Sequence, residues 1–307
     1  MGVDLSVEIG KLKLSTPLWV ASGTFGYEDT YEKLTDPSRL GALVTKTVTL
    51  KPRPGNSPPR VVETPAGLLN SIGLQNEGVD DFIKNKIRQL AKFEVPIIVS
   101  IAGERIEDYA ELAQKLDQVE EVEALEINIS CPNVDYGEEG ECLFAQDLYM
   151  TYGVVKAVRE STRKTIIAKL SPNVTNIVAI AQAAYDGGAD ALALVNTFLG
   201  MAVDIDKKRP KLGNIRGGLS GPAIKPIALY MVYEVAKSIK LPIIGMGGII
   251  SATDALEFII SGATAVAVGT GNFINPRVAL EIIEGIEGYL KENRLNSVKE
   301  LVGTLKA

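Results

Sequence analysis

The hydrophobic pattern of the chain alternates between two kinds of segment. Short runs of apolar, largely β-branched residues recur, and uninterrupted runs of this kind are typical of strands buried on both faces, as in a parallel sheet. Eight such runs occur, at residues 18–21, 42–46, 97–101, 124–129, 165–169, 191–195, 242–246 and 265–269. The pattern therefore predicts eight buried strands.

Amphipathic segments with helical spacing follow most of these runs, at residues 106–116, 148–160, 178–186, 225–238, 252–261 and 276–293. Residues that favour helix N-caps stand at Asp147, Thr175 and Ser251, and Gly-Ala pairs beginning at Gly188 and Gly262 favour turns into the next strand. Eight strands alternating with helices predict an α/β fold, a (β/α)₈ TIM barrel with inserted active-site loops. An open, doubly wound sheet is the alternative.

Nothing in the sequence divides the chain, so residues 1–307 are expected to form one barrel domain. Two long stretches lack regular periodicity, at residues 47–78 and 198–221, and each follows a predicted strand. Loops in that position lie at the carboxyl-terminal face of a barrel, where active sites are found. The basic run at 207–211 is interpreted as a solvated loop tip, with a docking patch as the alternative.

Histidine is absent from all 307 residues. This excludes Ser-His-Asp hydrolysis, histidine-ligated metals and histidine acid–base catalysis, and leaves Cys, Lys, Tyr or a carboxylate for proton transfer. The two cysteines, Cys131 and Cys142, fit neither a metal-ligand spacing nor a disulfide framework. No metal site is expected, and the free thiols favour the reducing cytoplasm.

The net charge of −6 gives no general attraction to nucleic acid. No stretch approaches the ~20 uninterrupted apolar residues of a membrane helix, and the first residues alternate in polarity instead of forming a secretory signal. Neither a nucleic-acid partner nor a membrane partner is expected.

Polar residues and glycines follow the predicted strands on the side where a barrel carries its active site. Singly, each has a simpler interpretation: a lysine that extends to solvent, an asparagine that shapes a turn, or a cysteine buried as a small hydrophobe. Their position at the same end of successive strands favours one shared site. In chain order they include Ser22, Lys46, Thr47, Ser100, Asn128, Cys131, Asn133, Lys169, Asn196, Thr197, Gly247, Gly248, Gly269 and Thr270.

The glycine pairs favour a phosphate site. Gly247-Gly248 and Gly269-Thr270 follow the last two strands, where barrels often bind phosphate with backbone N–H groups and a helix N-terminus, and residues 217–221 add another glycine-rich turn. Phosphosugar enzymes and flavoenzymes share such sites, so the glycines do not decide between them.

Lysines and asparagines narrow the ligand further. A lysine beside the N1/O2 edge of a flavin would stabilise the charge of the reduced ring, and a second cation could pair with a substrate carboxylate. Amides both donate and accept, which suits a ring with alternating N–H and C=O groups. The pattern fits a planar, acid-bearing, imide-like ring contacted by Lys46, Lys169, Asn70, Asn128, Asn133 and Asn196.

Seven segments, in collinear order, resemble dihydroorotate dehydrogenases. They are residues 45–76, 127–133 (INISCPN), 168–173 (AKLSPN), 195–197 (VNT), 217–229 (GGLSGPAIKPIAL), 245–249 (GMGGI) and 268–273 (VGTGNF). The cysteine in INISCPN and the KPRPGNSPPRVVETPAG loop resemble the class 1B catalytic subunit, whereas the membrane-associated class 2 enzymes have serine and an N-terminal extension.

This resemblance implies an FMN-dependent oxidation of (S)-dihydroorotate to orotate in de novo pyrimidine (UMP) biosynthesis, with Cys131 as the base and hydride passed to FMN. It implies substrate contacts from Lys46, Asn70, Ser71, Ile72, Gly73, Leu74, Asn128, Asn133, Asn196 and Thr197. It implies FMN contacts from Ser22, Lys46, Thr47, Ser100, Asn128, Lys169, Val195, Gly221, Gly247, Gly248, Gly269 and Thr270. Ser100 stands where related sequences often have asparagine, and serine reaches less far.

Reoxidation by NAD⁺ requires further groups, because the chain shows neither a Cys₄ iron–sulfur pattern nor a separate dinucleotide fold. The resemblance implies a partner subunit carrying FAD and a [2Fe–2S] cluster, around a homodimer core in a heterotetramer. The alternatives are a fumarate-dependent class 1A enzyme, a dihydropyrimidine dehydrogenase-like enzyme, or a barrel that only binds a phosphorylated ligand. The acidic run at 135–141 is interpreted as a lid or, alternatively, a solvated charge run.

Overall fold

The computed structural model describes residues 2–26, 35–129 and 146–306. Within them, eight parallel strands close into a barrel in the order β10-β15-β16-β3-β4-β7-β8-β9. The predicted TIM barrel is therefore confirmed, and the open-sheet alternative is wrong. The strands are β3 (Leu18–Val20), β4 (Ala42–Val44), β7 (Ile97–Ile101), β8 (Val122–Asn128), β9 (Thr165–Lys169), β10 (Ala191–Leu194), β15 (Ile243–Met246) and β16 (Ala265–Val268).

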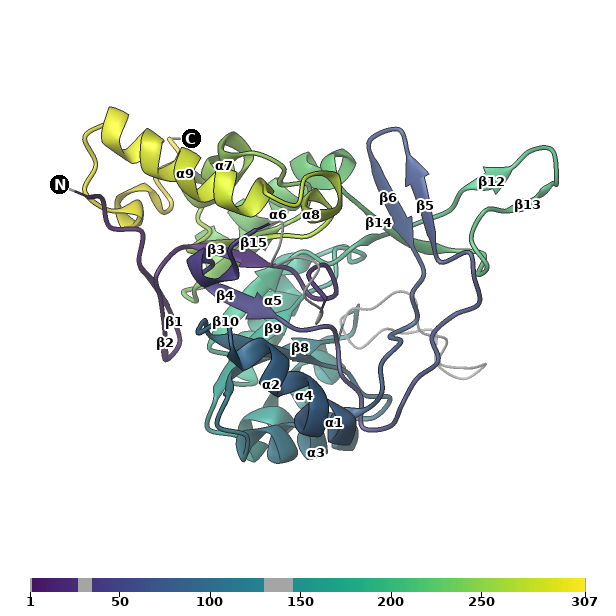
Figure 1. Cartoon of the computed structure of the whole chain (residues 1–307). Helices are drawn as coiled ribbons and strands as arrows, with labels where there is room; N and C mark the ends of the chain where they lie inside the picture. The colour runs from purple at the N-terminus through teal and green to yellow at the C-terminus, as the bar shows by residue number, and fades with distance from the viewer. Residues whose placement is uncertain (1, 27–34, 130–145, 307) are drawn as a thin grey trace.

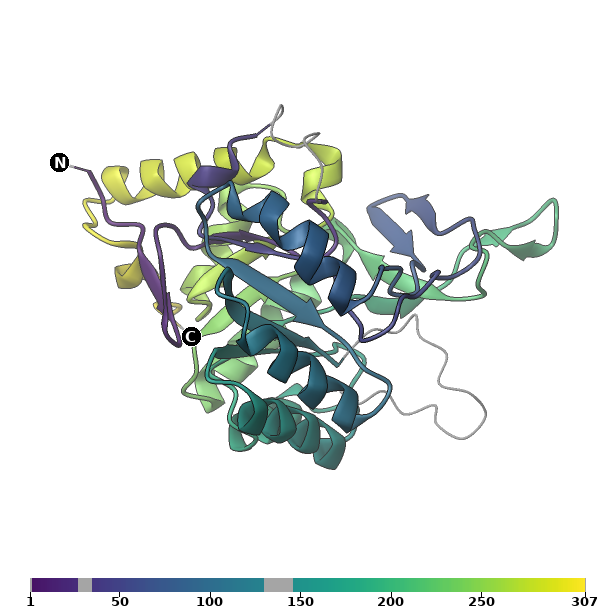
Figure 2. The ribbon, with the colours of Figure 1, turned by 60° about the horizontal axis from the view of Figure 1, so that its bottom comes forward.

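Helices cover the outside of the barrel (Figures 1 and 2). Each turns an apolar face toward the strands, as in α3, where Leu112 and Leu116 are buried one turn apart. The long helices are α3 (Ile106–Asp117), α4 (Leu148–Ser161), α5 (Ile177–Asp186), α6 (Lys225–Ser238), α7 (Ala252–Ile260) and α9 (Val278–Glu292). No helix in the part of the chain that the structure describes combines the length and apolar character needed to span a bilayer.

Local signals placed most helix ends correctly. Asp147 and Ser251 cap α4 and α7 with their side chains, and Gly188 and Gly262 adopt the positive φ angles of the predicted turns. The predicted cap Thr175 is wrong. Asn176 caps α5 instead, because its side-chain oxygen accepts the Ala179 N–H at 3.1 Å.

Several short elements have no clear signal in the sequence pattern. Between β4 and β7 the chain forms α1 (Val79–Asp81), the π-helical η2 (Phe82–Lys86) and α2 (Ile87–Ala91), where the π-turn disturbs the helical period. The others are α8 (Gly271–Ile274) and the 3₁₀ turns η1 (Pro37–Arg39), η4 (Pro222–Ile224) and η5 (Val298–Leu301).

An N-terminal hairpin of β1 (Val7–Ile9) and β2 (Leu12–Leu14) lies at the amino-terminal end of the barrel. The backbone N–H of Lys11, in its turn, donates to the hydroxyl of Thr165, the first residue of β9, at 3.0 Å. The hairpin therefore lies away from the carboxyl-terminal end of the barrel, where a binding site is expected.

The two long stretches without regular periodicity form strands that pair with each other. β5 (Val61–Thr64) and β6 (Gly67–Asn70) come from the first, and β11 (Phe198–Gly200) and β14 (Gly217–Ser220) from the second. They make an antiparallel sheet in the order β11-β14-β6-β5, called here the inserted sheet. Figure 1 shows it on the opposite side of the barrel from the two termini.

A further hairpin, β12 (Val203–Asp204) with β13 (Arg209–Pro210), extends beyond the inserted sheet (Figure 2). The basic run at 207–211 lies at this hairpin. The side chain of Lys207 is 61% exposed and pairs with Asp204 at 3.4 Å, which favours the solvated-tip interpretation over a docking patch.

Candidate functional site

A cavity of about 250 Å³ opens between the carboxyl ends of the barrel strands and the inserted sheet. Residues at or just after the ends of β3, β4, β8, β9, β10, β15 and β16 line it, and so do residues of β6 and β14. Residues separated by more than 240 positions in the sequence therefore line the same cavity. This is the position in which barrels of this type carry binding sites.

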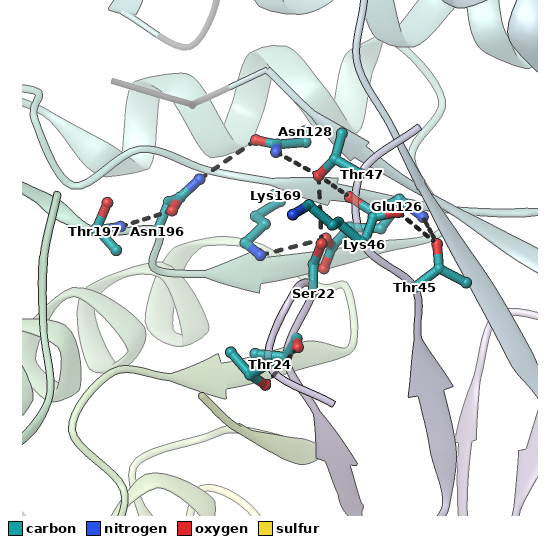
Figure 3. Close-up of polar contacts among 12 residues, drawn as sticks. Ser22, Thr24, Thr45, Lys46, Thr47, Glu126, Asn128, Lys169, Asn196 and Thr197 are labelled. Carbon is teal, nitrogen blue, oxygen red and sulfur yellow. Dashed lines mark hydrogen bonds and ion pairs between the residues drawn. The ribbon is translucent and has the colours of Figure 1, made fainter. Parts of the chain in front are cut away.

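A hydroxyl-rich corner of the cavity is centred on Thr47 (Figure 3). Its Oγ1 lies 3.3 Å from the hydroxyl of Ser22 and 3.0 Å from that of Ser100, and it accepts a hydrogen bond of 3.0 Å from the amide of Asn128. These bonds connect the carboxyl ends of four strands, β3, β4, β7 and β8. They fix the amide of Asn128, which is buried and lines the cavity.

Two asparagines extend the polar lining of the cavity from this corner. The amide Nδ2 of Asn196 lies 3.4 Å from Oδ1 of Asn128, and Oδ1 of Asn196 accepts the backbone N–H of Thr197 at 2.8 Å. On the inserted sheet, Asn70 faces the same cavity. Amides from two sides can satisfy a ring that both donates and accepts hydrogen bonds.

Two lysines provide positive charge. Burial lowers the pKa of Lys46 below its ordinary value, nearby Arg60 lowers it further, and Glu77 opposes both. Lys169, at the end of β9, is buried and forms an ion pair of 3.3 Å with Glu126. An anionic ligand in this cavity would therefore meet cations that water screens only weakly.

The opposite end of the cavity is rich in glycine. Gly247 and Gly248 follow β15 with φ angles of 124° and 79°, and Gly269, Thr270 and Gly271 follow β16. A Cβ at Gly248 would lie 2.7 Å from the Cβ of Lys225 and 2.9 Å from the carbonyl oxygen of Gly221, so glycine is required there. Glycines that bring backbone close to a space in this way suit a phosphate group.

Most of the predicted site residues lie around this one cavity. Of the substrate set, Lys46, Asn70, Ile72, Gly73, Leu74, Asn128, Asn196 and Thr197 line it, and of the cofactor set, Ser22, Lys46, Thr47, Asn128, Lys169, Val195, Gly221, Gly247, Gly248, Gly269 and Thr270 do so. Their roles remain predictions.

Two predicted residues that the structure describes, Ser71 and Ser100, are not among the lining. Ser71 is fully buried and accepts the amide of Asn56 at 2.8 Å, and Ser100 is fully buried behind Thr47. Ser100 therefore supports Thr47 in place of reaching the cavity, as its short side chain suggests. Cys131 and Asn133 lie outside the described residues, as does the acidic run at 135–141.

Other lining residues were not anticipated. Leu68 belongs to the inserted sheet, whose pairing has no local signal, and Ser220 lies in the glycine-rich turn expected near the phosphate but was not itself predicted. Met246 and Phe273 are apolar residues without a signal of their own. Glu126 does not line the cavity, but its position has a signal in the sequence, because it is a carboxylate inside the run at 124–129, whose other residues apart from Asn128 are apolar. A charge at such a position indicates a buried partner.

Together, the fold and the cavity define a TIM barrel with a glycine-rich phosphate end joined to a polar, cationic ring site. A family model described as dihydroorotate dehydrogenase matches residues 4–290. The chain belongs to the dihydroorotate dehydrogenase family.

Similar proteins share nearly the whole length of the chain. A protein of Geotalea uraniireducens (strain Rf4) is 54% identical over 302 residues, which cover 98% of both chains. Proteins of Geobacter sulfurreducens (strain ATCC 51573 / DSM 12127 / PCA) and Thermoanaerobacter sp. (strain X514) are each 52% identical, over 303 and 304 residues, covering 99% of this chain and 98% and 99% of theirs. All three are named dihydroorotate dehydrogenase B (NAD(+)), catalytic subunit.

Proposed function

We propose that this chain is the catalytic subunit of an NAD⁺-linked dihydroorotate dehydrogenase, which oxidises (S)-dihydroorotate to orotate in pyrimidine biosynthesis. The observation that carries the proposal is the composite cavity. Its glycine-rich end and its cationic, amide-lined end are continuous, so a phosphorylated ring cofactor and a flat acidic substrate can bind next to each other. A relative that is 54% identical over 98% of its length bears the corresponding name.

FMN fits the residues that are present. Backbone groups of Gly247, Gly248 and Gly269, with the hydroxyl of Thr270, would hold its phosphate, and Lys169 would lie beside the ring. When bound, FMN would accept a hydride from C6 of dihydroorotate. A cation near the N1/O2 edge favours that transfer, because negative charge develops there.

The protein's own residues would supply binding and proton transfer. Lys46 would pair with the substrate carboxylate, and Asn70, Asn128 and Asn196 would hydrogen-bond the imide edge. Cys131, as a thiolate, would remove the proton from C5, so that the C5=C6 bond of orotate forms as the hydride leaves C6. Cysteine suits the task in a chain without histidine, because its ordinary pKa of about 8.5 is near neutrality.

Electrons would leave through a partner. We propose that a second subunit with FAD and a [2Fe–2S] cluster passes them to NAD⁺, in a cytoplasmic heterotetramer built on a homodimer of this chain, each copy a single FMN-binding domain. NAD⁺ reduction that requires added electron-transfer subunit supports this assembly. Fumarate-driven turnover by the isolated chain contradicts it.

The experiment that tests the function is a visible absorbance spectrum of the purified protein before and after anaerobic addition of dihydroorotate. A flavin spectrum that bleaches with dihydroorotate is the expected result, because the substrate then reduces the bound FMN. Dihydrouracil, which lacks the carboxylate, is the matched control and should leave the spectrum unchanged. A colourless protein that cannot be reconstituted with FMN would contradict the proposal.

A further inference from the structure

A buried ion pair lies in the barrel interior beside the cavity. Nζ of Lys169 is 3.3 Å from Oε1 of Glu126, and the two side chains are 7% and 2% exposed. Figure 3 shows both side chains close to Ser22 and Thr47. Two charges withdrawn from water to this extent are tolerated only because they compensate each other.

The strand register explains why one member of the pair reaches the cavity and the other does not. Lys169 on β9 stands opposite Asn128 on β8, and both line the cavity. Glu126 precedes Asn128 by two residues on the same strand, so it points to the same side of the sheet, one layer deeper. Among the described residues, Glu126 is therefore connected to the cavity through the ammonium group of Lys169.

This arrangement gives the carboxylate two physical effects. It fixes the end of a long, flexible side chain, since one of the three N–H donors of the ammonium is directed at Oε1. It also offsets part of the positive charge that Lys169 presents to a ligand. Within the described residues, Glu126 is the ion-pair partner of Lys169, so both effects depend on this one residue.

We propose that Glu126 is a positioning residue that sets, through Lys169, how strongly the site stabilises reduced FMN. The inference rests on the proposed function, because it requires FMN beside Lys169. Because Glu126 offsets part of the positive charge of Lys169, the reduction potential of FMN is lower than it would be beside an unpaired lysine. The bound flavin then passes its electrons onward more readily.

The test is the midpoint potential of bound FMN, measured by spectrophotometric equilibration with a reference dye. Glu126→Gln keeps the size and an acceptor oxygen but removes the negative charge, so the potential should rise. We expect roughly a tenfold change in the reduction equilibrium, which for a two-electron couple is about 30 mV. Glu126→Asp keeps the charge but draws the ammonium deeper, so the potential should fall.

Two further variants separate positioning from other effects. In a Lys169→Gln background, Glu126→Gln should cause no further change, because Glu126 acts through the lysine. Glu123→Gln removes the same charge from an exposed position on β8 and should leave the potential unchanged. An unchanged potential in both Glu126 variants, or an equal shift with and without Lys169, would overturn the inference. If the unaltered protein binds no FMN, the proposed function itself fails.

Discussion

The hydroxyl of Thr270 donates a hydrogen bond of 2.7 Å to the hydroxyl of Ser220. Thr270 follows β16 and belongs to the barrel, whereas Ser220 is the last residue of β14 in the inserted sheet. Both residues line the cavity. The bond therefore joins the barrel to its insertion at the glycine-rich end, where the phosphate of the cofactor is proposed to bind.

Replacing Thr270 with valine tests this junction. Valine has nearly the same shape but no hydroxyl, so neither the bond to Ser220 in the free protein nor a hydroxyl contact to bound phosphate can form. We expect the dissociation constant of FMN to rise on the order of tenfold, since a hydrogen bond to a charged group contributes about 1.5–3 kcal/mol. Fluorescence titration of the apoprotein with FMN measures this. Thr270→Ser should bind almost normally, and equal affinity of the valine variant would contradict the assignment.

The backbone conformation at Gly248 leads to a second prediction. Gly248→Ala adds a Cβ that collides with the Cβ of Lys225 at 2.7 Å, at a residue whose φ of 79° already disfavours a side chain. Lys225 cannot easily move, because it is paired with Asp254 at 2.6 Å and with Glu257 at 2.8 Å. The loop must shift instead, so the variant should lose FMN affinity and melt at a lower temperature.

The matched control is Gly288→Ala. Gly288 lies in α9, and an added Cβ would have no atom within 4 Å. Alanine is favoured over glycine in a helix by roughly 0.5–1 kcal/mol, so this variant should be as stable as the parent or slightly more stable. Thermal unfolding compares the two. Equal melting temperatures for Gly248→Ala and the parent would show that the loop has more freedom than its contacts indicate.

The barrel was predictable because its strands carry the signal locally. Runs such as 165–169 and 265–269 are largely apolar and buried on both faces, a pattern typical of strands inside a parallel sheet. The cavity residues could then be predicted from their position, since residues such as Lys169 and Thr270 lie at or just after the end of a strand. Helix ends were less certain, because adjacent residues such as Thr175 and Asn176 can both act as caps.

The inserted sheet could not be predicted in the same way. Leu69 pairs with Leu219, 150 positions away, and no local periodicity encodes a partner at that separation. Glycines and prolines around both strands also weaken their alternation. For the same reason the hydrogen bond between Ser220 and Thr270 became visible only with the fold. The role of Glu126 likewise depends on register with Lys169, which the separate strands do not reveal.

Cys131 is predicted from the resemblance alone to be the base. Cys131→Ala should keep the FMN spectrum and lose about 10²- to 10⁴-fold in turnover, because this is the usual contribution of a general base. Cys131→Ser should regain some turnover only at high pH, since a hydroxyl is far harder to deprotonate than a thiol. Steady-state rates at several pH values measure both. Full activity of the alanine variant at neutral pH would remove Cys131 from the mechanism.

The charge of Lys46 leads to a prediction about pH. Burial lowers the pKa of Lys46 from its ordinary value of 10.5, so the ammonium in the free protein loses its proton at a lower pH than an exposed lysine. Between the lowered pKa and 10.5 the unfolded chain binds more protons than the native protein, so this residue makes stability rise with pH there. Binding of an anionic ligand has the opposite dependence, because it needs the protonated form.

Affinity for orotate should therefore fall as the pH rises through the lowered pKa of Lys46. Lys46→Met should bind orotate roughly 10- to 100-fold more weakly at neutral pH, the loss expected for a charge-assisted hydrogen bond, and should lack this decline at high pH. Lys51→Met, which removes an exposed lysine five residues along, should behave like the parent. Titration of the FMN-loaded proteins with orotate across the pH range measures all three. A parent and a Lys46→Met variant with parallel pH profiles would mean that another cation, such as Arg60, binds the carboxylate.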